Sequence, residues 1–338
     1  MRSQPGAGIV FDTALSRIDD ALALALLYGL DGRHTVRVVA ITVDRASLPA
    51  AVFCDLVSRF YAGTVSGAIG AGGRTLPVGL APDSRVKGDL PMFTLPLAKK
   101  NATGQPVYPT DIHDADDTAE PLALIRNALT AQMDHNAVVV LSGPATSLAN
   151  LLDVGGAKEL IARKVKLLAI AGGGFPEGQA DANLAADLPA ARRLFAEWPT
   201  PIVIAGQEVG AALLFPAASI EKDFAWAPAH PVADAYRANQ AMPYDAPTTA
   251  MAAVLYASNP ESNYFKLSDA GTVSVLDDGR TRFTRSASGT HRYVIVDAAE
   301  KDRVVKTYTD VSSAKPVAPP PRRPRVDVVK EQQPQKKD

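Results

Sequence analysis

Three aspartates, Asp12, Asp19 and Asp20, flank what the sequence predicts to be a single strand-to-helix turn. Asp12 ends the apolar run "GIVFD", and the pair Asp19-Asp20 directly precedes the apolar segment "ALALALLYGL". Carboxylates held close together repel one another unless a cation, water or hydrogen-bond donors lie between them. Hard cations such as Ca²⁺ bind about six to eight oxygen atoms, many of them from carboxylates. The turn is therefore a candidate site for a cation or for a ligand rich in hydroxyl groups.

Helix capping explains part of the same pattern. The segment Ser16–Asp19 has the S-x-x-[DE] spacing of a capping box, and acids in a first helical turn interact favourably with the helix dipole. Capping does not explain Asp12, which lies at the strand end. From this turn alone, structural capping and a cation or polyol site are both open.

The elements that must position these acids repeat a pattern of short apolar run, turn and amphipathic segment. This alternation predicts βα units and an open, mostly parallel, Rossmann-like α/β sheet flanked by helices. Ligands of such sheets bind outside the carboxyl ends of the strands, where Asp12, Ser142 and Gly206 fall. The strand and helix pairs are expected at Gly8–Asp12 with Ile18–Leu27, Val36–Asp44 with Leu48–Ala62, Ala137–Gly143 with Thr146–Leu152, and Pro201–Gly206 with the next helix, plus a strand in Lys166–Gly174.

Two regions depart from this pattern. Residues 77–118 are rich in proline and acidic side chains and are expected to form a long loop over the carboxyl edge of the sheet. From Thr272 the spacing becomes strand-like, and Asp278-Gly279 between alternating segments predicts a C-terminal β-hairpin. We expect one α/β domain over residues 1–312 and a Pro- and Lys-rich, disordered tail over residues 313–338.

The composition excludes several classes of function. The 338 residues carry a formal net charge of -1 and a single cysteine, Cys54, with five histidines. This argues against a mainly electrostatic nucleic-acid or membrane-surface role and against a standard zinc cluster. No stretch has the roughly 18 apolar residues of a membrane span, and no signal-peptide core is seen. We expect a cytoplasmic protein that acts on a small molecule, without nucleic-acid or membrane partners; a homo-oligomer is compatible with the sequence.

Several segments, taken together, resemble the inosine/uridine-preferring nucleoside hydrolases. The resemblance runs from about Gly8 to Asp297, and the paired Asp-Asp, the G-P-x-T segment and the G-G-G…N…D-x-x-A-A segment are specific as a set. The matching segments are "IVFDT…IDDALALAL", "VVAITV", "VVVLSGPATSLANLL", "LLAIAGGGFPEGQADANLAADLPAARRLF" and "PIVIAGQEVG".

The resemblance implies cleavage of an N-glycosidic bond. In that family one Ca²⁺ chelates the ribose 2′- and 3′-hydroxyls and holds a water, which a nearby aspartate deprotonates for attack on the anomeric carbon. The metal lowers the pKa of its water, and carboxylates stabilise the oxocarbenium-like charge. The implied cofactor is therefore Ca²⁺, and the implied substrate is a nucleoside or another ribosyl compound.

The family's first motif, D-x-D-x-G-x-D-D, is only partly present. Asp12 matches its first aspartate, and Asp19 and Asp20 match its final pair. The resemblance implies that Asp12 and Asp19 are catalytic, that Asp19 accepts a ribose hydroxyl and that Asp20 binds the metal. The second aspartate, both metal ligand and general base, falls on Ala14; the glycine is missing and the turn is one residue longer. Ser142 matches the position whose backbone carbonyl binds the metal.

Substrate-binding positions are implied in the second half of the chain. Asn183 matches the family's ribose-binding asparagine, while Asp181 and Gln179 stand where the family has glutamate and asparagine. Asp187 matches an aspartate before the "PAA" helix, and its position favours a structural role as helix N-cap. Tyr244 precedes the last helix of the motif and is the aromatic candidate for contact with a nucleobase.

The last metal ligand of the family has two possible counterparts. Asp245 in "MPYDAPTTAMAAVLYA" would serve if the loop is rebuilt, whereas an ungapped match to "AAVLYA" places Ala250 there. The ungapped match is favoured. At least one metal carboxylate is then lost. Arg17, in the lengthened turn, would supply positive charge by pairing with Asp12 or Asp20 if it points inward; a solvated side chain is the favoured alternative.

We therefore expect an N-ribohydrolase-like enzyme that cleaves a ribosyl bond by water attack on the anomeric carbon. The replacement of metal-binding aspartates by Ala14, and by Ala250 in the ungapped match, favours caution about activity. The alternative is a catalytically inactive pseudo-hydrolase that binds a ribosyl ligand or a protein partner.

Overall fold

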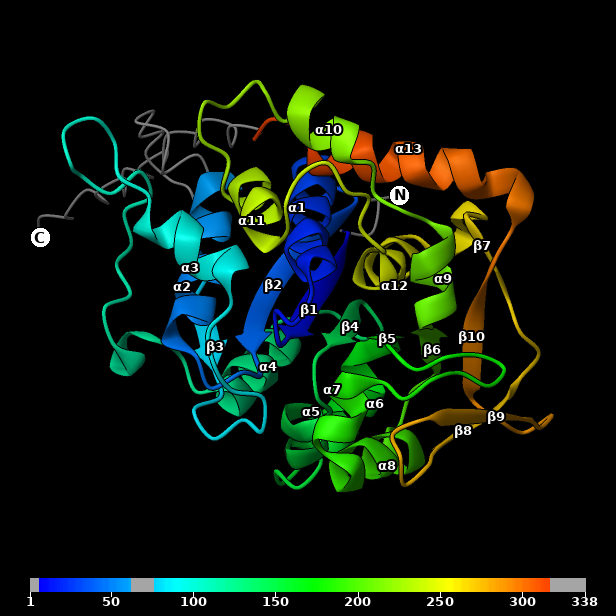
Figure 1. Ribbon diagram of the computed structural model, residues 1–338. Helices are drawn as coiled ribbons and strands as arrows, with labels where there is room; N and C mark the ends of the chain where they lie inside the picture. The colour runs from blue at the N-terminus through cyan, green and yellow to red at the C-terminus, as the bar shows by residue number, and fades with distance from the viewer. Residues whose placement is uncertain (1–5, 62–75, 317–338) are drawn as a thin grey trace, which may run out of the picture.

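Strand β1 (Ala7–Thr13) lies inside the sheet, and its apolar residues are buried on both faces. In the computed structural model, which describes residues 6–61 and 76–316, it pairs in parallel with β2 on one side and β4 on the other (Figure 1). The parallel part of the sheet has the order β3-β2-β1-β4-β5-β6. Its other strands are β2 (Val36–Val43), β3 (Val78–Leu80), β4 (Ala137–Ser142), β5 (Val165–Ala171) and β6 (Ile202–Ala205). The predicted open, mostly parallel α/β sheet is confirmed.

The C-terminal strands complete the sheet on the β6 side. β8 (Gly271–Val275) and β9 (Thr281–Arg285) form an antiparallel hairpin, in which Val275 pairs with Thr281. β10 (His291–Val296) pairs in parallel with β6 and in antiparallel with β8 and with β7 (Phe265–Leu267). The hairpin predicted from Asp278-Gly279 is confirmed, and β10 joins it to the parallel strands.

Helices cover both faces of the sheet (Figure 1). Ile9 and Phe11 of β1 belong to the core on one face, and Val10 between them belongs to the core on the other, as the strand period of two requires. The first face carries α1 (Ile18–Gly32), α2 (Leu48–Tyr61), α9 (Gln207–Ala212), α10 (Ala217–Lys222), α11 (Pro231–Asn239), α12 (Thr249–Ser258) and α13 (Lys301–Ser312). The second carries α4 (Pro121–Thr130), α5 (Thr146–Leu151), α6 (Ala157–Lys164), α7 (Ala182–Ala186) and α8 (Leu188–Glu197).

Helix α1 is buried along most of its length and contacts α11, α12 and α13. Its continuous apolar segment allows contacts on several sides, and Gly29 lets α13 approach closely. A Cβ atom at Gly29 would lie 2.1 Å from the carbonyl oxygen of Val311. At the other end of α1, Asp19 accepts the N–H of Ala250 in α12, so the N-terminal end is fixed at the sheet edge.

The region 77–118 is more ordered than the sequence predicts. It contains β3, helix α3 (Pro91–Ala98) and the 3-10 helix η1 (Ala115–Asp117), so the expectation of one long loop is wrong. Proline at the first position of α3 is compatible with a helix start, which a reading based on proline content overlooks. The remaining 3-10 helices are η2 (Pro260–Ser262) and η3 (Ala298–Glu300).

Helix α13 ends at Ser312, the residue at which the sequence placed the domain boundary. Most of the predicted tail, residues 317–338, lies outside the described residues. In the part of the chain that the structure describes, no helix is both long enough and apolar enough to cross a membrane.

Candidate functional site at the carboxyl edge of the sheet

The turn between β1 and α1 is held by hydrogen bonds that its backbone N–H groups donate. Leu15 has φ 46°, in the left-handed region, and its N–H donates to Thr13 Oγ1 at 3.0 Å. The N–H of Ala14 donates to the carbonyl of Ser142 at 3.1 Å. A left-handed conformation costs a bulky residue about 1–2 kcal/mol. The turn therefore uses a left-handed residue other than glycine, and its surroundings must stabilise it.

Arg45 supplies much of that stabilisation. It directly follows β2 and Asp44, and it is 4% exposed. Its guanidinium joins the β1–α1 turn to the segment after β3, because it donates hydrogen bonds to oxygen atoms of both segments. The acceptors are the carbonyl oxygens of Ala14 at 2.7 Å, Lys87 at 2.9 Å and Gly88 at 2.8 Å, and Ser16 Oγ at 3.1 Å.

Arg17 points toward the acids at the start of α1. Its Nε donates to Asp19 Oδ1 at 3.0 Å, and the guanidinium side chain is 33% exposed. The other oxygen, Asp19 Oδ2, accepts the backbone N–H of Ala250 at 2.7 Å. The favoured expectation of a solvated Arg17 is wrong, since the arginine forms an ion pair; its partner is Asp19 rather than Asp12 or Asp20.

Asp20 caps the helix one residue later than predicted. Arg17 is the N-cap of α1, and its backbone N–H donates to Asp20 Oδ2 at 3.1 Å. The predicted capping box of Ser16 with Asp19 is wrong because α1 begins at Ile18, which makes Asp20 its third residue. Asp20 Oδ1 accepts the hydroxyl of Ser142 at the end of β4.

Burial dominates the electrostatics of the acids at this edge. Burial raises the pKa of Asp20 to about 6, with Asp19 adding to the effect and Arg17 opposing it. Asp12 is fully buried; its Oδ1 accepts the hydroxyl of Thr42 at 2.9 Å. Burial, reinforced by the charge of Asp44, raises the pKa of Asp12 well above its usual range. Asp12 therefore holds a proton to higher pH than an exposed aspartate does.

Asp181 organises the junction between β5 and α7. Its Oδ1 caps α7 by accepting the N–H groups of Asn183 at 3.0 Å and Leu184 at 3.1 Å. Its Oδ2 accepts the N–H of Gly173 at 3.1 Å and Nε2 of Gln207 at 3.0 Å. Asn183 is buried, 3% exposed. The carboxylate thus fixes Asn183 at the same edge of the sheet as the β1–α1 turn.

Asp187 is a helix cap, as its position before the "PAA" helix predicts. Its Oδ1 accepts the N–H of Ala190 at 3.2 Å in α8, and its Oδ2 accepts Thr146 Oγ1 at 3.0 Å. Arg85, whose side chain is 66% exposed, also donates to Oδ2 at 3.1 Å. The structural role of Asp187 is confirmed.

Three of the expected site residues have other surroundings. Asp245 Oδ1 accepts the N–H of Ala217 at 2.8 Å, at the start of α10, and the residue is exposed. Tyr244 stacks on Tyr236 with ring centroids 4.4 Å apart and donates its hydroxyl to the Tyr236 carbonyl at 2.7 Å. Gln179 is exposed. Their roles in metal or substrate binding stay predictions.

The residues present do not fit a Ca²⁺ ion. Among residues 6–61 and 76–316, no group of three or more His, Cys, Asp or Glu side chains is placed to hold a metal. Both Asp20 oxygens accept hydrogen bonds from the chain, and so does the Ser142 carbonyl. The backbone N–H of Ala250 also occupies one oxygen of Asp19. No mechanistic step through calcium follows from this arrangement.

Two polar residues of the site, the cationic Arg45 and the neutral amide Gln207, were not predicted from the sequence. Each directly follows a strand end or its glycine, after Asp44 and after Gly206. That placement was the available signal, because the carboxyl ends of parallel strands meet at one edge. Among the residues at the strand ends, only the acids and glycines matched a binding motif, so Arg45 and Gln207 were not predicted.

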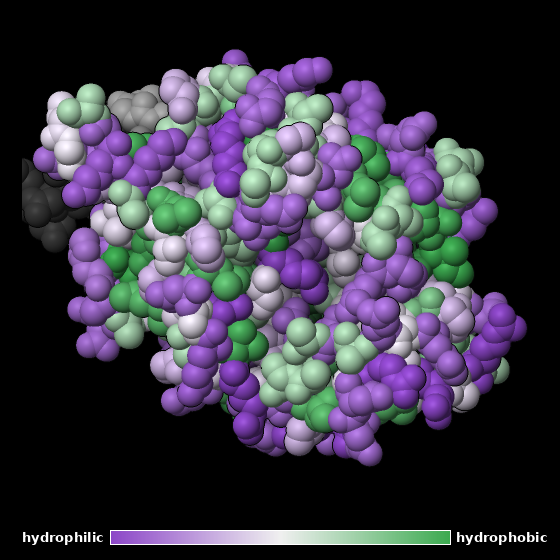
Figure 2. All heavy atoms as spheres, viewed as in Figure 1, coloured by the Kyte–Doolittle hydropathy of each residue, from purple (hydrophilic) through white to green (hydrophobic). Residues whose placement is uncertain are grey.

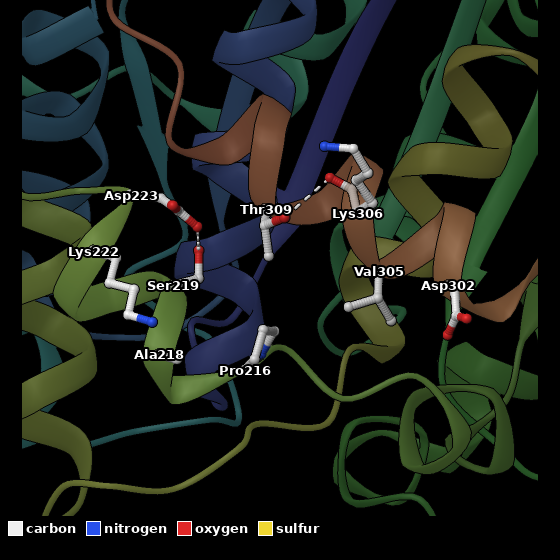
Figure 3. A pocket seen from close by; sticks show the side chains of 9 residues that line it. All are labelled: Pro216, Ala218, Ser219, Lys222, Asp223, Asp302, Val305, Lys306 and Thr309. Atoms are coloured by element: carbon white, nitrogen blue, oxygen red, sulfur yellow. Dashed lines mark hydrogen bonds between the residues drawn. The ribbon is translucent and has the colours of Figure 1, made fainter.

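The site face is hollowed over the start of α1, with hydrophilic side chains in the hollow (Figure 2). A separate shallow groove lies between α10 and α13 (Figure 3). Ser219 there donates to Asp223 at 2.7 Å, and Thr309 to the Lys306 carbonyl at 3.0 Å, so these polar groups are bonded to residues close by in the sequence. The groove therefore offers less to a ligand than the sheet edge does.

The family of the chain follows from its sequence. The model of the inosine-uridine preferring nucleoside hydrolase family matches residues 9–334. The chain therefore belongs to this family, as the resemblance of its motifs predicted. A comparison with curated protein sequences gave no match.

Solved structures share the fold at low identity. The inosine-uridine preferring nucleoside hydrolase from Bacillus anthracis has a TM-score of 0.65 and 17% identity, over 91% of this chain and 99% of that one. The purine-preferring ribonucleoside hydrolase from Gardnerella vaginalis has a TM-score of 0.66 and 17% identity, over 90% and 98%. Type III effector protein XopQ, complexed with adenosine diphosphate ribose, has a TM-score of 0.62 and 16% identity, over 92% and 94%.

Proposed function

We propose that this member of the family binds a nucleoside or another ribosyl compound at the carboxyl edge of the sheet without hydrolysing it at a metal-activated rate. Buried polar atoms that lack a partner within the described residues carry the proposal. Three of them belong to side chains of this edge: Asp12 Oδ2, Arg17 Nη2 and Asn183 Nδ2. Leaving such an atom unsatisfied costs about 1–3 kcal/mol, so a protein keeps few of them.

A ribose matches these atoms chemically. Each hydroxyl group donates one hydrogen bond and accepts others. Asp12 Oδ2 offers an acceptor when the carboxyl group is ionised and a donor when it is protonated, whereas Arg17 Nη2 and Asn183 Nδ2 offer donors. In the resemblance of the sequence motifs, Asp12 and Asn183 also match polar positions of the family. A vicinal diol, which needs both donors and acceptors, is therefore the preferred ligand group.

The absence of a carboxylate at Ala14 supports binding over hydrolysis. The family's general base falls at this position, and a methyl group cannot accept a proton. General acid–base catalysis contributes about 10²–10⁴-fold to a rate, so its loss lowers turnover by that order.

Hydrolysis is the second candidate, and Asp12 favours it. Its Oδ2 has no partner within the described residues, and it lies at the strand end that the family's catalytic motif starts from. A carboxylate with a free oxygen could orient and deprotonate a water. In this version Asp12→Asn abolishes turnover, whereas Asn150→Ala, an exposed substitution, leaves it unchanged.

Calorimetric titration of the purified chain with inosine, uridine, ribose and adenosine diphosphate ribose tests the binding proposal. We expect at least one of them to bind, and Asn183→Ala to weaken its binding roughly 5- to 150-fold, the loss of one buried hydrogen bond. Asn150→Ala is the matched control and should bind like the wild type. Binding by none of the four, or equal binding by Asn183→Ala, contradicts the proposal. Release of the free base, detected by chromatography, would show hydrolysis and so distinguish the second candidate from binding without turnover.

A further inference from the structure

We infer that the Arg17 guanidinium is the resident cation of this site and takes over the charge role that the family assigns to a bound divalent metal. Arg17 Nε contacts Asp19 Oδ1 at 3.0 Å, and its backbone N–H contacts Asp20 Oδ2 at 3.1 Å. Calcium chemistry is the family's property, whereas the arginine belongs to the lengthened turn of this chain. The inference concerns that exchange and does not depend on which ligand the site binds.

The charge balance of the turn requires a cation. Asp19, Asp20 and Asp181 are 2%, 0% and 1% exposed, and buried carboxylates without a compensating charge are strongly destabilising. Burial opposes the charged form of Arg17, but the carboxylates of these three residues outweigh it and raise its pKa. A guanidinium suits such a place because it stays charged at all working pH values and is weakly hydrated.

The same atoms that hold Arg17 exclude a metal. Calcium needs about six to eight oxygen ligands, and the two oxygens of Asp20 already accept Ser142 Oγ–H and the Arg17 N–H. Asp19 is likewise bonded at both oxygens, by Arg17 and by the N–H of Ala250. A metal entering here would have to displace these donors and meet the guanidinium as a like charge.

The Nη2 group of the guanidinium remains available. Arg17 Nη2 is buried and has no partner in the described part of the chain, although the side chain as a whole is one-third exposed. The Nε atom faces Asp19, so the buried Nη2 group can donate to a bound molecule. The arginine can therefore neutralise the acids and at the same time donate a hydrogen bond to a ligand oxygen. A bound metal ion would likewise neutralise the acids and bind a ligand oxygen, and would in addition activate a water.

Thermal unfolding with added metal tests the inference on the intact chain. In the wild type, millimolar Ca²⁺ or a chelator should shift Tm by less than about 1 °C, because a site that binds no metal gains nothing by mass action. Arg17→Ala should unfold several degrees lower, and Ca²⁺ should recover part of that loss where K⁺ at equal ionic strength does not. Arg17→Lys should keep most of the wild-type Tm without metal.

Matched controls make the result decisive. Arg85→Ala removes an exposed arginine that also pairs with an aspartate, and it should show neither the loss nor the recovery by Ca²⁺. The double variant Ala14→Asp with Arg17→Ala should bind Ca²⁺ in calorimetry, where the wild type gives no binding heat. The inference is overturned if the wild type binds Ca²⁺ or loses Tm with chelator. It is equally overturned if Arg17→Ala unfolds at the same temperature as Arg85→Ala. If Arg17→Ala fails to fold, the wild-type titration and Arg17→Lys still decide.

Discussion

Replacing Arg45 by methionine removes the guanidinium that ties the β1–α1 turn to the segment after β3. Methionine keeps much of the apolar volume of the arginine stem, so the loss falls mainly on the polar contacts. Those contacts are hydrogen bonds to the carbonyls of Ala14, Lys87 and Gly88 and to Ser16 Oγ.

The size of the effect follows from the number and kind of these bonds. A hydrogen bond from a charged donor contributes about 1.5–3 kcal/mol, and the buried charge itself costs several kcal/mol to desolvate. Four such bonds to a 4% exposed residue therefore leave a net stabilisation on the order of 3 kcal/mol. The left-handed Leu15 lies between two of the bonded residues, so the turn should also lose its fixed geometry.

Urea unfolding measures the change, with Arg85→Met as the matched control. The Arg85 side chain is 66% exposed, and an exposed ion pair contributes about 0–1 kcal/mol. We expect Arg45→Met to lose about 3 kcal/mol and also to weaken ligand binding at the sheet edge. A loss below about 1 kcal/mol, or equal losses for the two variants, would refute the view that Arg45 clamps the turn.

Three further predictions concern the scaffold around the site. Burial lowers the pKa of His230 to about 3, so below about pH 6.5 the unfolded state binds a proton that the folded state does not. In urea titrations the stability advantage of the wild type over His230→Gln should therefore shrink by about 2.5 kcal/mol between pH 7 and 4.5. A constant difference contradicts a buried neutral imidazole. Gly29→Ala places a Cβ 2.1 Å from the Val311 carbonyl and should cost about 2 kcal/mol or more in thermal unfolding, whereas Gly155→Ala, with nothing within 4 Å, should change little; equal effects disprove the contact. Asp187→Ala removes the cap of α8 and should lower the free energy of unfolding in urea by about 1 kcal/mol. Asp187→Asn should keep most of the stability, whereas Asp187→Val, which cannot cap, should not; equal losses for the two contradict capping as the cause.

The fold was predictable because it depends on local patterns. Alternating apolar runs and amphipathic segments specified the parallel strands, and Asp278-Gly279 specified the hairpin. The place of β10 was not predictable, since its parallel pairing with β6 joins segments that no local pattern relates. Region 77–118 was misread because proline at a helix start looks the same in composition as proline in a loop.

The site was predictable in part, and the limits are physical. The strand-end rule located Asp12 and the helix start located Asp19 and Asp20, but a one-residue uncertainty in that start exchanged the capping acid. Arg45 acts on backbone carbonyls, which every residue has, so no side-chain motif could reveal its partners. The direction of Arg17 depended on acids of α1 and on Asp181 at the start of α7, which only the folded chain brings together.

The late position of β10 has a consequence for synthesis of the chain on the ribosome. Strand β6 (Ile202–Ala205) pairs with β5 on one side, and its other side is covered only by β10 (His291–Val296). At translation rates of about 5–20 residues per second, this edge stays open for roughly 5–20 s after it is made. An unpaired apolar strand edge is a template for association with other chains. During this interval the open side of β6 has no partner strand, and the arrival of β10 ends it.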